Sequence, residues 1–143
     1  MDEIIKGSLS HALRCLDRRE ISARELTLAI LDRIEALDGE FHSYATVNPE
    51  VALAAAAHAD AQRARGDVGE TSVLLGIPLG IKDIIAAADL PTHVGSVALR
   101  DWQPGLESTL ARRLREAGAV MLGKHQTTEA ACGDHHPSIT RPV

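Results

Sequence analysis

The sequence predicts an α/β protein in which helices come first and the strands of a mixed sheet follow. Helical patterns fill residues 1–70, whereas apolar runs rich in β-branched residues begin only after residue 71. One helical pattern then separates two such runs, and the order strand, helix, strand indicates a crossover and an at least partly parallel sheet. We therefore expect a helical scaffold segment, residues 1–70, and the start of an α/β core, residues 71–143, which together form part of one domain.

Local signals place the first two helices. Leucines at spacings of four and three predict an amphipathic helix over about 8–18. Ser22 and Glu25 form the S-x-x-E pattern of a capping box, which opens a second helix. The pair Asp38-Gly39 is expected to end this helix.

A third helix is expected at Asn48, which is a suitable N-cap, because Pro49 then takes the first helical position. Its alanine-rich sequence favours a helix to about residue 65. On this interpretation residues 1–70 are helical throughout, and these helices form a scaffold that carries no evident chemistry.

The second half predicts two buried strands joined by a helix. The first strand is expected near residues 79–84 and the second near 119–123, because both are short, apolar and bounded by Gly or Pro. An amphipathic pattern over about 108–117 predicts the helix between them, with Gly118 as its C′ residue. Residues 127–131 read as the start of another helix.

Composition argues against several function classes. Only 2% of the residues are aromatic and the net charge is −5, which suits neither base stacking nor a duplex-binding surface, so no direct nucleic-acid partner is expected. The apolar stretches are too short to span a bilayer, so no membrane partner is expected. Cys15 and Cys132 lie far apart without a paired spacing, which is typical of reduced thiols and of a cytoplasmic protein.

Lys82 is the most informative residue, because the chain has only three lysines and this one ends an apolar strand. An amine in apolar surroundings loses hydration, which lowers its pKa and makes it a candidate general base. The common alternative is an ion pair with Asp83 or a solvated position at the strand end. Lys124, at the end of the other strand, is expected to be a solvated terminus.

A second group of polar residues follows the last strand and offers ligand types that zinc accepts. It consists of His125, Glu129, Cys132, Asp134, His135 and His136, with His93 elsewhere in the chain. No second spaced pair accompanies Cys132-x-x-His135, and adjacent histidines seldom face one metal, so no metal site is expected. The roles of Cys132, His135 and His136 stay open.

Several blocks in order carry a resemblance to a known family. They are Gly76-Ile77-Pro78-Leu79-Gly80-Ile81-Lys82-Asp83, Gly95-Ser96-Val97-Ala98-Leu99, residues 110–124 and Thr127-Thr128-Glu129. With these blocks the chain resembles the amidase signature family, and the helical start suits that fold. The resemblance implies hydrolysis of small carboxamides by a Ser–cis-Ser–Lys triad without a metal or organic cofactor. Lys82 matches the catalytic lysine, which takes a proton through the bridging serine.

The chain also departs from the family. The familiar Gly-Lys-Thr-Asn segment reads Gly123-Lys124-His125-Gln126. In the family, the Gly/Ser-rich segments with the bridging and nucleophilic serines come after the point that corresponds to Val143, and the 143 residues contain neither segment. Because triad members act together, these 143 residues alone are expected not to hydrolyse an amide. The alternatives are a non-catalytic scaffold that binds a partner chain or a second copy to complete the fold, and a subunit of a tRNA-dependent amidotransferase.

Overall fold

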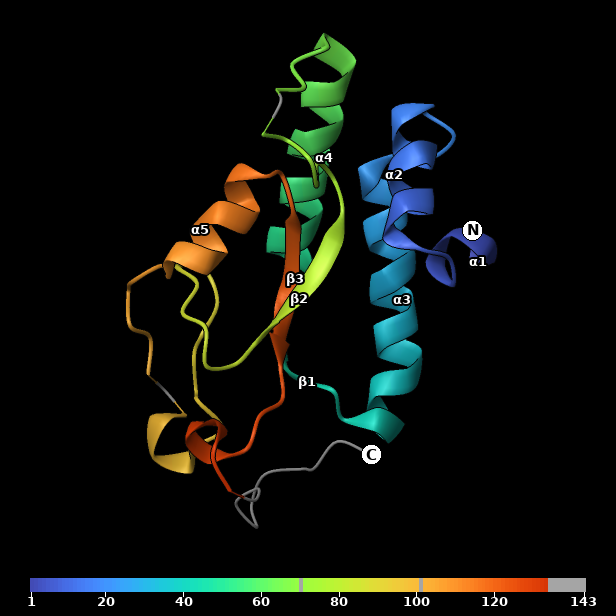
Figure 1. Ribbon diagram of the computed structural model, residues 1–143. Coiled ribbons are helices and arrows are strands. Elements are labelled where there is room, and N and C mark those ends of the chain that lie inside the picture. The colour runs from blue at the N-terminus through green and yellow to red at the C-terminus, as the bar shows by residue number, and fades with distance from the viewer. Residues whose placement is uncertain (70, 101, 134–143) are drawn as a thin grey trace.

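The computed structural model describes residues 1–69, 71–100 and 102–133, and it confirms a mixed α/β fold (Figure 1). Its helices are α1 (Asp2–Ile5), α2 (Leu9–Asp17), α3 (Ala23–Phe41), α4 (Pro49–Arg65) and α5 (Thr109–Glu116). Its strands are β1 (Tyr44–Val47), β2 (Pro78–Lys82) and β3 (Val120–His125), and two 3-10 turns are η1 (Val97–Leu99) and η2 (Glu129–Ala131). None of the helices in these ranges has the length and apolarity that a bilayer crossing requires.

The helices begin where the sequence predicts, because side-chain oxygens accept the free N–H groups of the first turns. The capping box of α3 is confirmed: the Ser22 N–H donates to Glu25 Oε2 at 2.9 Å and the Glu25 N–H donates to Ser22 Oγ at 3.1 Å. Asn48 accepts from the Val51 N–H at the start of α4, and Ser108 caps α5 in the same way. At the other end of α5, Gly118 has the expected left-handed conformation, with φ of 87°.

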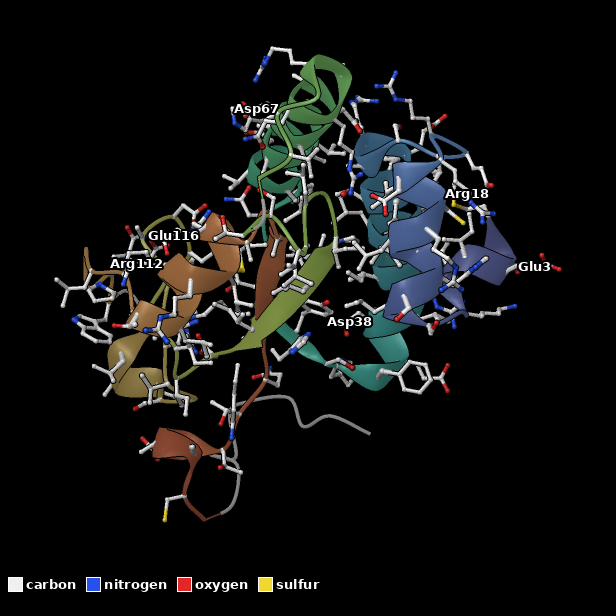
Figure 2. All side chains as sticks on the ribbon, turned by 45° about the horizontal axis from the view of Figure 1, so that its top comes forward. Glu3, Arg18, Asp38, Asp67, Arg112 and Glu116 are labelled. Carbon is white, nitrogen blue, oxygen red and sulfur yellow. The ribbon has the colours of Figure 1, made fainter. Side chains whose placement is uncertain are left out.

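Two expectations for the first half are wrong. Helix α3 continues through Asp38-Gly39 to Phe41, and His42 in the left-handed conformation ends it. The carboxylate of Asp38 accepts the Ser43 N–H at 2.7 Å and the Tyr44 N–H, so this residue turns the chain from within the helix (Figure 2 labels Asp38). The following residues are not helical but form β1, which exists because it pairs with β3.

The helix expected to start at residues 127–131 is much shorter in the structure. Residues 127–131 form only the single turn η2, in which Ala130 has a non-helical φ of 52°.

Strand β3 is the centre of the sheet, which has the order β1-β3-β2. It runs parallel to β2 and antiparallel to β1. On one face, Val120 and Leu122 pack into the core formed with α2, α3 and α4, and on the other Met121 packs with Ala111 of α5. Figure 1 shows this arrangement, with α3 and α5 on opposite sides of the sheet.

Several charged residues of the helices lie on the outside of the protein, although the side chain of Arg63 on α4 is only 11% exposed. Figure 2 shows Arg112 and Glu116 on the outer side of α5, where Arg112 Nη1 lies 2.6 Å from Glu116 Oε1. Glu3 and Arg18 occupy the periphery of the N-terminal helices in the same view.

The close approach of β1 to β3 requires glycine at position 123, because a methyl group there would overlap the carbonyl oxygen of Thr46. We predict that Gly123→Ala lowers the free energy of unfolding by about 2–3 kcal/mol, which is the usual cost of forcing atoms into a packed site. Urea unfolding followed by circular dichroism measures this change.

Gly39→Ala is the matched control, because nothing lies within 4 Å of the position of its Cβ and the residue sits inside α3. This substitution is expected to raise stability by about 0.5–1 kcal/mol, the usual advantage of alanine over glycine in a helix. Equal effects of the two substitutions would contradict the proposed packing of β1 on Gly123.

Candidate active site

The candidate site lies where the two parallel strands end. Lys82 and His125 are the last residues of β2 and β3 and are partners in the register. The Asp83 N–H donates to the His125 carbonyl at 3.0 Å, so the two chain segments stay joined for one residue beyond β2. Ligands of α/β proteins commonly bind beyond the carboxyl ends of parallel strands, and both ends meet here.

A bulge decides which side chains enter the interior at this edge. Leu79 pairs with Met121 but Gly80 pairs with Gly123, so Leu122 is an extra residue in β3. An extra residue reverses the alternation of the strand beyond it. Lys124 therefore lies opposite Ile81, on the face of the sheet that packs against α5.

Lys124 is fully buried, with 0% of its surface exposed, so the expectation of a solvated strand terminus is wrong. Its Nζ donates to Thr92 Oγ1 at 2.8 Å, to the Pro91 carbonyl at 3.1 Å and to Asp83 Oδ1 at 3.2 Å. An ammonium group has three donors, and all three have acceptors here. Burial lowers the pKa of Lys124, while the charge of Asp83 opposes this shift.

The carboxylate of Asp83 is the counter-charge and is itself 1% exposed. Both of its oxygens lie 3.2 Å from the backbone N–H of His93, and its backbone carbonyl accepts the Val94 N–H at 3.1 Å. The loop from residue 83 to 94 is therefore closed on itself by Asp83 and held to β3 by Lys124.

Lys82 has a different environment from the one its sequence neighbours suggest. It is exposed, whereas Ile81 before it and Asp83 after it are buried, as expected for alternating residues at the end of a strand. Its ammonium group forms no hydrogen bond or ion pair within the described ranges, since Asp83 pairs with Lys124 instead. The apolar surroundings inferred from the sequence are thus absent from this part of the protein.

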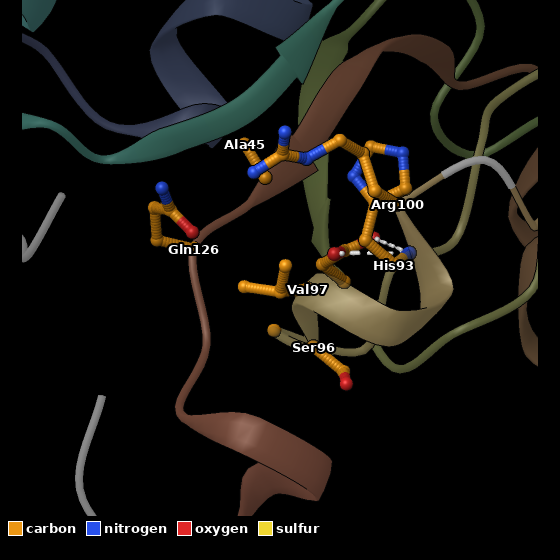
Figure 3. Close-up of a pocket in the computed structure, with 8 residues that line it drawn as sticks. Ala45, His93, Ser96, Val97, Arg100 and Gln126 are labelled. Carbon is orange, nitrogen blue, oxygen red and sulfur yellow. Dashed lines mark hydrogen bonds between the residues drawn. The ribbon is translucent and has the colours of Figure 1, made fainter. Parts of the chain in front are cut away.

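A cavity of about 280 Å³ opens beside this edge (Figure 3). It is lined by Ala45, Asp83, His93, Gly95, Ser96, Val97, Arg100 and Gln126. Figure 3 shows the side chain of Arg100 reaching across the cavity toward Ala45. Two of the lining residues, Asp83 and Gln126, directly follow Lys82 and His125, so the cavity starts where the parallel strands stop.

The cavity wall is held by contacts between two loops. Ser96 Oγ donates to Glu129 Oε1 at 2.7 Å, and the Ala130 N–H donates to the Val94 carbonyl at 2.8 Å. Val94 has a φ of 57°, which costs about 1–3 kcal/mol for a β-branched residue and is most common at functional sites. Sequence reasoning missed Arg100 and Gln126, because neither stands in a pattern that distinguishes it from a surface residue.

The residues considered as zinc ligands do not form a metal site in the part of the chain that the structure describes. His125 packs edge-on against Tyr44, with ring centroids 4.7 Å apart, and Glu129 binds Ser96. No three His, Cys, Asp or Glu residues of the described ranges are grouped to hold an ion. Asp134, His135 and His136 lie outside those ranges.

Comparisons with known proteins show the family of this chain. The family model for amidases matches residues 25–141. A putative amidase AmiD of Mycobacterium tuberculosis is 44% identical over 142 residues, which cover 99% of this chain and 30% of the relative. A glutamyl-tRNA(Gln) amidotransferase subunit of Moorella thermoacetica is 47% identical over 118 residues, which cover 82% of this chain and 24% of that relative.

The fold of this chain is also similar to that of solved amidase structures. The native peptide amidase of Stenotrophomonas maltophilia superposes with a TM-score of 0.80 and 38% identity, over 87% of this chain and 25% of that enzyme. The chain thus spans 24–30% of the length of these relatives.

Burial lowers the pKa of His125 below its usual 6.5, and the charge of Asp38 opposes this shift only in part. Between the lowered value and 6.5 the unfolded chain binds more protons, so stability falls as the pH falls through this window. We predict that acidification from pH 7.5 to 5.5 lowers the free energy of unfolding by at most about 1.4 kcal/mol per pH unit on account of this group.

The measurement compares His125→Thr with the native chain by urea unfolding at both pH values. The variant should lose this part of the pH dependence, and His58→Gln, which changes an exposed histidine of α4, should keep it. An identical pH dependence in His125→Thr and the native chain would contradict the assignment.

Proposed function

This chain belongs to the amidase family, and on that premise we propose that Lys82 is the base of a Ser–cis-Ser–Lys amide hydrolase. The single observation that carries the proposal is the position of Lys82. The amine of Lys82 is exposed at the carboxyl end of β2 and has no hydrogen-bond or ion-pair partner among the residues that the structure describes. It stands next to a cavity and within the sequence block that matches the family's lysine.

In the proposed reaction, this chain supplies the base and additional segments supply the two serines. The neutral amine of Lys82 takes a proton, by way of the bridging serine, from the nucleophilic serine as its oxygen bonds to the amide carbonyl carbon. The proton then passes to the leaving nitrogen, and water releases the acyl group. The matched part is 30% and 24% of the two relatives, and we propose that additional segments such as theirs supply both serines and bury Lys82.

We propose small linear amides as substrates, with no metal or organic cofactor, in the cytoplasm. Two free cysteines support this location, because oxidising compartments favour disulfides. A homo-oligomer or a partner chain that completes the sheet remains part of the proposal, since β1 and β2 are both edge strands in the described sheet.

A second candidate is the amidase component of a tRNA-dependent amidotransferase. The 47% identity with the glutamyl-tRNA(Gln) amidotransferase subunit of Moorella thermoacetica favours it. The two candidates share the site and differ in the ammonia acceptor. Glutamine hydrolysis that depends on a partner protein would select the amidotransferase, whereas hydrolysis of free amides by one chain would select the amidase.

The role of Lys82 is tested in a chimera in which this chain replaces the matching quarter of the Stenotrophomonas maltophilia peptide amidase. Lys82→Ala is expected to lower kcat by about 10³-fold, because the base is lost. Lys82→Arg keeps the charge but cannot act as a base, so it should be equally inactive. Ammonia release from a peptide amide measures the rate.

Lys6→Ala is the matched control, since Lys6 is an exposed lysine whose ion pair with Asp2 lies on α1. This variant should keep the activity of the chimera. A Lys82→Ala chimera with more than about a tenth of the parent rate would exceed what remains after loss of a general base and would refute the proposal.

The 143 residues by themselves are predicted not to release ammonia from peptide amides or glutamine, because a triad without its serines retains little of its effect. The same ammonia assay on the isolated chain checks this prediction. Turnover that disappears in Lys82→Ala would contradict it and would require a nucleophile within these residues.

A further inference from the structure

The proposed chemistry uses Lys82 and leaves two buried charges, Asp83 and Lys124, without a role. A buried ion pair is weak evidence for stability, because desolvation costs several kcal/mol per ion and apolar replacements are often as stable. The side chains of this pair are 2% and 0% exposed. A buried pair of this kind is best explained by the local conformation that it determines. Here that conformation is next to Lys82, the proposed base.

The pair fixes the backbone on the carboxyl side of Lys82. The N–H of Asp83 is held by the His125 carbonyl, and its carboxylate is held by the Lys124 ammonium and the His93 N–H. The carbonyl of Lys82 accepts the Ile85 N–H at 2.9 Å. Both the carbonyl and the N–H of the peptide group that joins residues 82 and 83 are therefore hydrogen-bonded.

The anchoring of the neighbouring residues also determines the side of the strand on which the Lys82 side chain lies. Ile81 is 5% exposed and Asp83 is 1% exposed, and both are held in the interior. Successive side chains of a strand point to opposite faces, so anchoring both neighbours inward turns Lys82 outward. Without the counter-charge of Lys124, a buried carboxylate at position 83 would be driven toward water, and Lys82 would turn with it.

The same ammonium group also places the cavity. Its two other hydrogen bonds hold Pro91 and Thr92, and the chain continues directly into His93 and the loop that carries Arg100. One buried amine thus links the strand end that bears Lys82 to the cavity wall.

We propose that Asp83 and Lys124 are positioning residues, whose buried ion pair sets the direction of Lys82 and its distance from the neighbouring cavity. This inference rests on the proposed role of Lys82. Lys124 acts only through Asp83 and the 83–94 loop, and neither residue of the pair exchanges a proton with the substrate.

The first test is Lys124→Met in the chimera described above. Misplacement of a catalytic group by about 1 Å costs about 10²-fold in rate, so kcat should fall by about that factor while KM stays within about twofold. Arg115→Met is the matched control. It removes the cation that pairs with Asp89 of the same loop and with Glu107, and all three of these side chains are partly exposed. This control should leave kcat unchanged.

The double variant Asp83→Asn/Lys124→Met separates positioning from folding. It removes both charges, so it should recover the stability that Lys124→Met loses through an unpaired buried carboxylate. Its kcat should nevertheless stay low, because Pro91 and Thr92 are no longer held. Recovery of kcat together with stability would overturn the proposal, and so would loss of the fold in both variants, since the pair would then be only structural.

An NMR measurement on the isolated chain tests the position of Lys82 without an activity assay. Because the chain has three lysines, labelling with ¹³Cε-lysine gives three signals, and Lys124→Met leaves those of Lys6 and Lys82. The Lys82 signal should move in Lys124→Met and not in Arg115→Met. An unmoved Lys82 signal would overturn the inference even where Lys82→Ala abolishes activity. An active Lys82→Ala chimera would instead refute the proposed function.

Discussion

A charged amine sealed inside the protein is the constraint on which the candidate site depends. The Nζ of Lys124 has no access to water, so its three protons need acceptors from the protein. The chain meets this requirement by returning after β2, so that Asp83, Pro91 and Thr92 surround the ammonium group. The loop from 83 to 94 thus supplies all three acceptors of this group, and it leads into the wall of the cavity.

The central strand makes this burial possible by two local irregularities. The bulge at Leu122 moves Lys124 to the face that packs against α5, and Gly123 lets β1 lie directly against β3. A regular strand would place Lys124 on the same face as Val120 and Leu122, among the apolar side chains of α2, α3 and α4.

The sequence predicts what depends on local chemistry. Caps and periodicity give the starts of α3 and α4, and short apolar runs locate β2 and β3. Strand β1 is missed because four residues carry little pattern and their conformation comes from pairing with a distant strand. The sequence predicts Lys82 in apolar surroundings and Lys124 in solvent, and the structure shows the opposite for a similar reason. A register shift of one residue decides on which side of the sheet a side chain lies, and the local hydrophobicity of the sequence does not reveal such a shift.

Amide hydrogen exchange tests the closure of the 83–94 loop by its buried ion pair most directly. The N–H groups of Asp83, His93 and Val94 bond to His125 and Asp83 and should exchange as slowly as the Val120 N–H, which bonds to Ile77. Exchange of His93 and Val94 at the rate of an unstructured peptide, with Val120 still protected, would contradict the account. The loop would then open independently of the sheet, and the pair could not direct Lys82.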